Sequence, residues 1–162
     1  MAQPVEFNFE VKGIKALRAK LDTSLFEAAL VEVLNEAGEF ARDKAREKAP
    51  EYTGALVEGI SFEMKYPSVT VQSTAAHSAY VEYGTKGGAP TARRYPPINA
   101  LRGWARRHGV NPWYLMYKIG RDGTKPQPFM APAERAVKRK LPSLIRTAAK
   151  QIAKQWSKKK AA

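Results

Sequence analysis

Few side chains in this sequence could carry acid–base, nucleophilic or metal chemistry. It has two histidines, His77 and His108, and no cysteine. Neither histidine has the HExxH-like or paired spacing with carboxylates that a metal site needs. No serine has the setting of a nucleophile elbow, and without cysteine there is no thiolate chemistry and no disulfide. The sequence therefore predicts no metal site and no cofactor.

Carboxylates gather along the first long helical pattern and are the only group that could indicate catalysis. Their spacing makes several of them neighbours on a helix surface; they are Glu27, Glu32, Glu36, Glu39, Asp43 and Glu47. Two-metal nucleases use such groups, but only where the groups converge on a cleft. Lysines and arginines are interleaved with them, which favours a solvated helix face. We expect no enzyme and keep a Mg²⁺-dependent nuclease as a third hypothesis.

The formal net charge of +13 is concentrated in the later part of the chain. A charge of this size favours contact with nucleic acid or another anionic surface and says nothing about the fold. One cluster of arginines could face DNA or acidic neighbouring proteins, and the sequence leaves both open: Arg93, Arg94, Arg102, Arg106 and Arg107.

Two short helices are predicted over residues 98–108 and 112–119, joined by Gly109-Val110-Asn111. Pro112 fits the first position of the second helix, with Asn111 as its cap. The pair could form a helix-turn-helix. A DNA-reading helix usually offers Asn, Gln or Arg at its start, whereas this one begins Pro-Trp-Tyr-Leu-Met, with Trp113 on its apolar side. That start favours packing on protein.

Alternation of apolar and polar residues predicts four short strands. The predicted strands are Val5–Val11, Ile60–Tyr66, Val69–Ser73 and Ala79–Tyr83, the last ending in a turn at Gly84. We expect Ala79–Tyr83 to be the centre of the sheet. A short helix is predicted over Gly13–Leu21.

Two long helices are predicted by apolar residues at spacings of three and four. The first starts at Ser24 and is stopped by Pro50, and the second starts at Pro132, with a kink or break near Leu141 caused by Pro142. A Gly- and Arg-rich loop over Gly84–Tyr95 and an extended Lys125–Met130 segment complete the pattern.

These elements predict an α+β fold, a small mixed or antiparallel sheet of about four strands packed against two long helices, with an inserted pair of short helices. The chain of 162 residues fits one domain over residues 1–157. We place the insertion at about 84–127 and a basic disordered tail at 158–162. No stretch approaches the ~20 apolar residues of a membrane span.

The order of these features resembles the tail-completion family of tailed bacteriophages, also called neck or head–tail joining proteins. The resemblance covers about Leu25 to Ala149. It rests on the ordered set Tyr-Thr-Gly-Ala-Leu from Tyr52, Ala-Tyr-Val-Glu-Tyr-Gly-Thr from Ala79, Pro-Pro-Ile-Asn-Ala-Leu-Arg-Gly-Trp from Pro96, and Pro-Phe-Met-Ala-Pro-Ala from Pro128.

The resemblance implies a non-catalytic virion structural protein. Members form a ring, typically six-fold, at the head-proximal end of the tail tube, and the ring contacts the tail tube protein and the head-completion or connector protein. DNA passes through the ring. The implied location is the virion neck, with assembly in the host cytoplasm and no membrane.

Residues for partner binding or the ring interface are expected in the loops and the short strand: Tyr80, Glu82, Tyr83, Thr85, Tyr95, Pro128 and Phe129. Aromatic side chains are common anchors of interfaces. The alternative class is a basic DNA-binding accessory protein, whose affinity would fall steeply with salt. A ring protein would instead self-associate or cap tail tubes.

Overall fold

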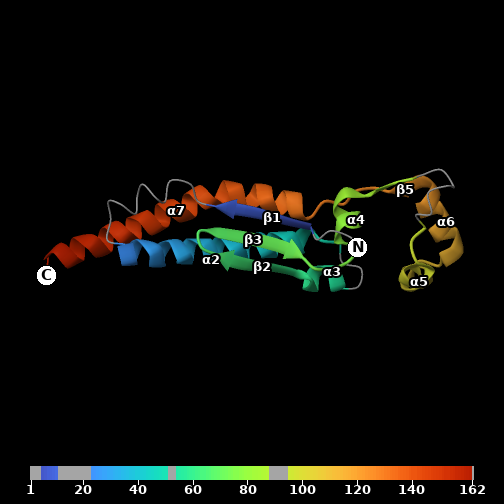
Figure 1. Cartoon of the computed structure of the whole chain (residues 1–162), viewed down its shortest axis with the longest axis horizontal. Coiled ribbons are helices and arrows are strands. Elements are labelled where there is room, and N and C mark those ends of the chain that lie inside the picture. The colour runs from blue at the N-terminus through green and yellow to red at the C-terminus, as the bar shows by residue number, and fades with distance from the viewer. Residues whose placement is uncertain (1–4, 11–22, 51–53, 88–94, 162) are drawn as a thin grey trace.

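The computed structural model describes residues 5–10, 23–50, 54–87 and 95–161 (Figure 1). Its main elements form an elongated molecule with a helix-and-sheet body at one end and a small helical unit at the other. The predicted helix over Gly13–Leu21 and the middle of the predicted Gly84–Tyr95 loop lie outside the described residues. The α+β class predicted from the sequence is confirmed.

The main sheet has three antiparallel strands in the order β1-β3-β2. The strands are β1 (Val5–Glu10), β2 (Ile60–Lys65) and β3 (Ser68–Ser73). The register aligns Val5, Ser73 and Ile60 in one row, and all three side chains are buried. Because side chains alternate between faces, every second residue faces the core and the others form a polar outer face.

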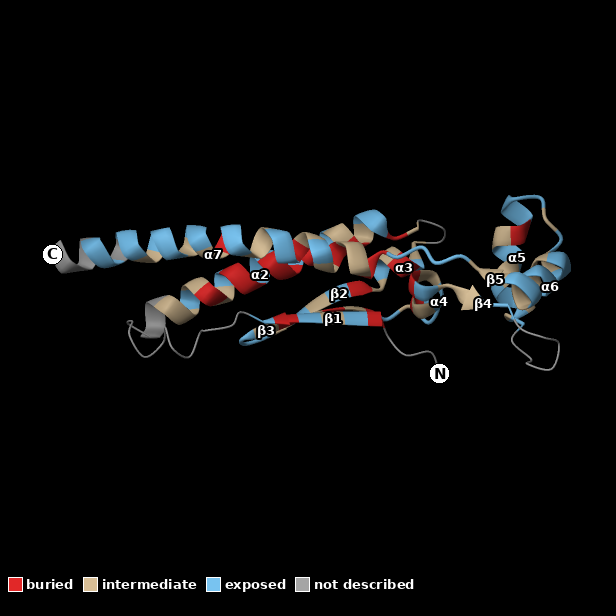
Figure 2. Cartoon of the chain, turned by 90° about the horizontal axis from the view of Figure 1, so that it is seen from above, coloured by how far each residue is buried: buried red, intermediate tan, exposed pale blue. Residues whose placement is uncertain are grey.

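Two long helices, α2 (Thr23–Lys48) and α7 (Met130–Ala161), run in opposite directions and cover the inner face of the sheet (Figures 1 and 2). Alanines line α2 at every fourth position, and Ala37, Ala41 and Ala45 are fully buried. Small side chains at this spacing let α2 approach Ala133 and Val137 of α7, which are also fully buried. Figure 2 shows the buried residues gathered between these layers.

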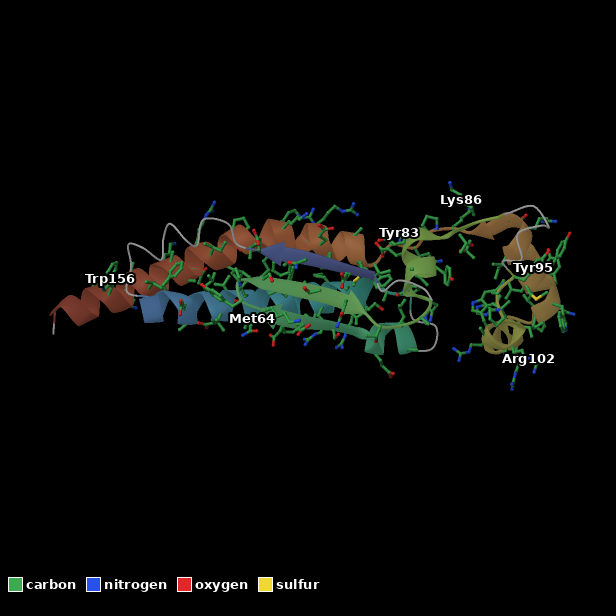
Figure 3. All side chains as sticks on the ribbon, viewed as in Figure 1. Met64, Tyr83, Lys86, Tyr95, Arg102 and Trp156 are labelled. Carbon is green, nitrogen blue, oxygen red and sulfur yellow. The ribbon has the colours of Figure 1, made fainter. Side chains whose placement is uncertain are left out.

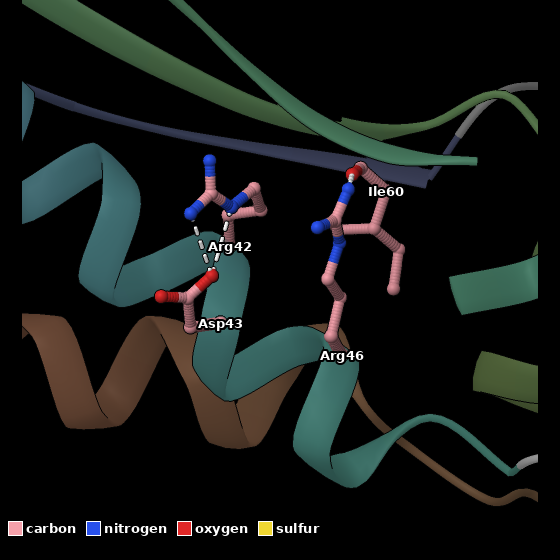
Figure 4. Close-up of polar contacts among 4 residues, drawn as sticks. All are labelled: Arg42, Asp43, Arg46 and Ile60. Atoms are coloured by element: carbon pink, nitrogen blue, oxygen red, sulfur yellow. Dashed lines mark hydrogen bonds and ion pairs between the residues drawn. The ribbon is translucent and has the colours of Figure 1, made fainter. Parts of the chain in front are cut away.

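Polar side chains on α2 also tie the body together (Figure 4). Arg46 donates from Nη2 to the carbonyl oxygen of Ile60 at 2.8 Å, which joins the helix to β2. On the next turn towards the N-terminus, Arg42 pairs with Asp43 at 2.8 Å. Lys140 of α7 lies 4.3 Å from the centre of the Phe40 ring, a cation–π contact between the two long helices.

The predicted central strand at Ala79–Tyr83 is wrong. This segment is a short helix, α4 (Ser78–Tyr83), so the sheet has three strands there instead of four. Ser78 and Glu82, four residues apart, are buried, whereas Tyr80 and Tyr83, three apart, are exposed. The strand preference of Tyr and Val is outweighed by contacts that Glu82 makes with a distant part of the chain.

The inserted pair of short helices is confirmed as α5 (Ile98–Arg107) and α6 (Pro112–Asp122). The helix α3 (Ala55–Glu58) precedes β2, and two-residue strands β4 (Thr85–Lys86) and β5 (Gly123–Thr124) pair antiparallel. We call α2, α7 and the three-stranded sheet the body, β4–β5 the ribbon, and residues 95–122 the head. The ribbon carries the head away from the body (Figure 1).

The last helix begins at Met130, two residues before the predicted start at Pro132. Of the kink or break predicted at Pro142, the break does not occur, because the helix continues through this residue. It also extends to Ala161, so Lys158, Lys159 and Lys160, expected in a disordered tail, have a helical backbone.

Candidate assembly interface

Two of the predicted interface tyrosines project from α4. Tyr80 is 54% exposed and Tyr83 is 71% exposed. Their side chains lie on the solvent side of a helix whose other side is buried through Ser78 and Glu82. Figure 3 places Tyr83 where the ribbon leaves the body. The structure thus leaves both aromatic side chains available to a partner.

Glu82 has a different position from the one predicted. Its side chain is buried, and its carboxylate accepts hydrogen bonds from three backbone amides at the start of α7. Oε2 accepts from Phe129 at 2.7 Å and Met130 at 2.9 Å, and Oε1 accepts from Ala131 at 3.0 Å. The first amides of a helix lack partners within the helix, and a carboxylate there also stabilises the helix dipole. Glu82 therefore caps α7 and is not available as a surface contact.

Phe129 and Pro128 are neighbours with opposite exposure. Phe129 is fully buried in the hydrophobic core of the body and is not at the surface, whereas Pro128 is exposed. The amide of Gln127 donates to the carbonyl of Val81 at 2.8 Å. Together with Glu82, this contact joins the segment before α7 to α4. The chain therefore enters and leaves the ribbon at one fixed place on the body.

Thr85 belongs to the ribbon itself. Its hydroxyl lies 3.0 Å from that of Thr124 and accepts a hydrogen bond from the Thr124 amide at 2.9 Å. Gly123 has φ +76°, and a Cβ there would lie 2.0 Å from the Thr85 carbonyl oxygen. Only glycine fits such a close approach in the left-handed region. These contacts fix how the ribbon presents the head.

The head has a small interior. Asn111 caps α6 by accepting from the amide of Trp113 at 2.8 Å, as its sequence predicts. Among its described residues, Ala105 alone is classed as buried. Trp104 stacks on His108 with ring centres 3.9 Å apart. A helix pair with so little apolar burial gains little stability from its own core.

Large aromatic side chains cover the outside of the head. Trp113 is 61%, Tyr114 59%, Tyr117 54% and Tyr95 42% exposed, and we call these four the aromatic patch. Tyr95 stacks on Tyr117 with ring centres 6.5 Å apart. Of the four, Tyr95 alone is predicted from the sequence as an interface candidate, and Trp113, which is predicted on the apolar side of its helix, is exposed. The apolar start of α6 lies on the outside of the head, where its aromatic side chains are exposed.

Both helices of the head also expose cationic side chains. Arg102, Arg106 and Arg107 of α5 are exposed, and Figure 3 shows Arg102 on the outside of the head. Arg93 and Arg94 lie outside the described residues. On α6, Arg121 donates to both carboxylate oxygens of Asp122, at 2.6 and 2.8 Å. These hydrogen bonds hold the pKa of the Asp122 carboxyl below its usual value.

The body carries the opposite charge on the outside of α2. Five exposed carboxylates follow one another at helical spacing, and we call them the acidic stripe: Glu32, Glu36, Glu39, Asp43 and Glu47. Lys44 hydrogen-bonds to Glu47 and holds the pKa of that carboxyl below its usual value. The stripe spans about 22 Å at 1.5 Å per residue. It lies on a convex helix surface rather than converging, and no group of three or more His, Asp or Glu in the described residues could hold a metal ion.

Part of the chain is similar to a known protein family. Residues 14–84 match the model of a family described as "Bacteriophage HK97-gp10, putative tail-component". The matched region includes α2, α3, β2, β3 and α4, which is less than half of the chain, and it leaves out the head and α7. No curated protein and no solved structure matches the chain. None of the described helices has the length and hydropathy of a membrane span.

Proposed function

We propose that this protein is a virion structural protein that forms a ring at the head-proximal end of a phage tail tube. The ring, with six copies as the expected number, would complete the tail and join it to the head connector while DNA passes through. The observation that carries the proposal is the match of residues 14–84 to a phage tail-component family. That match supports a tail component, and the ring and the joining role are our extension of it.

The exposed surface of the chain supports an assembly role. Aromatic residues and arginine are the side chains most enriched in the centres of interfaces. Here they gather on a head that a ribbon holds away from the body, where a neighbouring subunit can reach it (Figure 1). In a closed ring each subunit uses two different surfaces. The head and the body supply two such surfaces on one chain.

The decisive experiment is electron microscopy of lysates from a phage whose copy of this gene carries a stop codon. The proposal expects filled heads beside separate, unjoined tails, and joined particles again when the wild-type gene is supplied from a plasmid. Normal joined particles without the protein would rule out the joining role.

A second function is favoured by the exposed Arg102 and Arg106 of α5. A basic accessory protein would bind duplex DNA near physiological ionic strength and would lose affinity steeply as salt rises. Binding of a labelled 30-base-pair duplex, measured by fluorescence anisotropy across a salt series, separates the two. The ring proposal expects weak binding that is unrelated to self-association. We propose no catalysis for either function.

A further inference from the structure

The outer face of α6 combines large aromatic side chains with positive charge. Trp113, Tyr117 and Arg121 follow at four-residue spacing, Tyr114 and Lys118 lie beside them, and all five are exposed. Residues at this spacing share one helix face. The face is about 12 Å long at 1.5 Å per residue. Arginine, tryptophan and tyrosine together have the composition of an interface hot spot.

The acidic residues of the chain are concentrated in its first part. Residues 84–127 contain nine Lys or Arg and one acidic residue, Asp122, whereas residues 1–65 contain twelve of the fifteen acidic residues beside nine Lys or Arg. The exposed carboxylates of the acidic stripe lie on α2, with Glu36 54% and Asp43 61% exposed. Both also pair within the chain, Glu36 with Lys140 at 3.5 Å and Asp43 with Arg42 at 2.8 Å, but such exposed ion pairs contribute only about 0–1 kcal/mol and can be exchanged for a new partner. Surfaces of opposite sign attract and set the register of an interface.

The head of one chain does not reach most of the acidic stripe of the same chain. The ribbon holds α5 and α6 beyond α4, at the far end of the molecule from most of α2 (Figures 1 and 2). The contacts of Glu82 and Gln127 fix the base of the ribbon on the body. A complementary contact between these two surfaces is therefore one between different copies.

We propose that the outer face of α6 docks on the acidic stripe of a second copy of this chain. This inference rests on the proposed ring and names the two surfaces that build it. The contact joins two different surfaces, so it leaves a free α6 face and a free stripe at the ends of any pair. Each copy can then add a neighbour on both sides until the ring closes. The stripe, about 22 Å long, is long enough to accommodate the α6 face of about 12 Å.

Charge reversal gives a test that separates this contact from general repulsion. The head-reversed variant carries Lys118→Glu and Arg121→Glu, and the stripe-reversed variant carries Glu32→Lys and Glu39→Lys. All four positions are exposed, so both chains should fold, which circular dichroism and thermal melting verify. Each variant alone places like charges at the interface and should self-associate at least about a hundredfold more weakly than wild type.

A mixture of the two variants should assemble again, because each reversed surface now meets one of opposite charge. The assemblies should contain the two chains in equal numbers and in alternation, which native mass spectrometry measures when one chain carries a tag. Matched controls reverse exposed charges elsewhere, Glu6→Lys with Glu10→Lys on β1 and Arg139→Glu with Arg146→Glu on α7. The controls should assemble as wild type does.

Three outcomes would overturn the inference. They are a wild-type chain that stays monomeric at millimolar concentration, variants that assemble alone as well as wild type, and a mixture that gains nothing over its components. A head-reversed chain that loses only duplex DNA binding would assign the face to DNA instead. If the variants assemble normally and also restore joined particles in the stop-codon phage, the ring function stands and this interface is wrong.

Discussion

The cap that Glu82 places on α7 gives the sharpest test of the structure. Replacing it by alanine removes the acceptor of three backbone amides, two of which are buried. A buried donor left without a partner costs about 1–3 kcal/mol, so the Glu82→Ala change should lower the free energy of unfolding by about 3 kcal/mol. Near the melting temperature of a chain of this size, that equals a decrease of roughly 6–12 °C.

The Glu82→Gln change refines the same prediction. The amide oxygen can still accept from Phe129 and Met130, but the NH₂ group then faces the Ala131 amide. We expect about half the effect of alanine, because one hydrogen bond and the charge are lost. The control is Glu63→Gln, which removes an exposed carboxylate paired with Lys65; such a pair contributes about 0–1 kcal/mol.

Differential scanning calorimetry measures the stability, and hydrogen exchange locates the change. Amide exchange should speed up first at the start of α7 and in α4, which the carboxylate joins. If Glu82→Ala melts within about 2 °C of the Glu63→Gln control, a change worth under about 1 kcal/mol, the carboxylate does not cap α7, and the reasoning that fixes the base of the ribbon fails with it.

Three further predictions follow from close approaches and charge pairs. Gly38→Ala puts a Cβ 2.5 Å from the Phe62 ring, so it should destabilise the body by about 1–3 kcal/mol in chemical denaturation; an unchanged midpoint would contradict this packing. Gly123→Ala should abolish ribbon pairing, seen as rapid amide exchange there with the body amides still protected. In NMR titrations the Asp122 carboxyl should show a pKa below its usual value, and Arg121→Ala should raise this pKa towards that value. The ion pair is therefore present at neutral pH and is lost as the pH falls through the lowered pKa of Asp122. An Asp122 pKa that Arg121→Ala leaves unchanged would contradict the pairing.

The sequence predicts most of the body because its signals are local. Alternation in Val5–Glu10 and Ile60–Lys65 follows the two-residue period of a strand with one buried face, and the structure confirms both strands. The stop at Pro50 and the Asn111–Pro112 start of α6 follow from backbone chemistry at single positions. Such features need no knowledge of distant parts of the chain.

The predictions for Ala79–Tyr83 and Phe129 differ from the structure for another reason, which is that contacts distant in the sequence determine both. Ala79–Tyr83 alternates over five residues, which is too short to separate a strand from one and a half helical turns. The helical conformation of this segment places Glu82 in contact with backbone amides that lie 47 to 49 residues away. Phe129 is buried for the same reason, since the capped start of α7 carries it into the body. No local pattern reports these contacts.

Trp113 differs in the other direction, because a residue expected to pack is exposed, and this exposure is relevant to function. The spacing of Trp113 with Met116 and Ile119 predicts one apolar helix face that packs against other side chains. The two helices of the head are too small to bury Trp113, which is 61% exposed. Burying a large apolar side chain stabilises a protein by about 1.5–3 kcal/mol, so a chain that leaves Trp113, Tyr114 and Tyr117 in water forgoes that stability as a monomer. The same aromatic surface becomes favourable when a neighbour covers it. The proposed assembly would use both the exposed head and the carboxylates of α2, whereas DNA binding alone would use only the arginines.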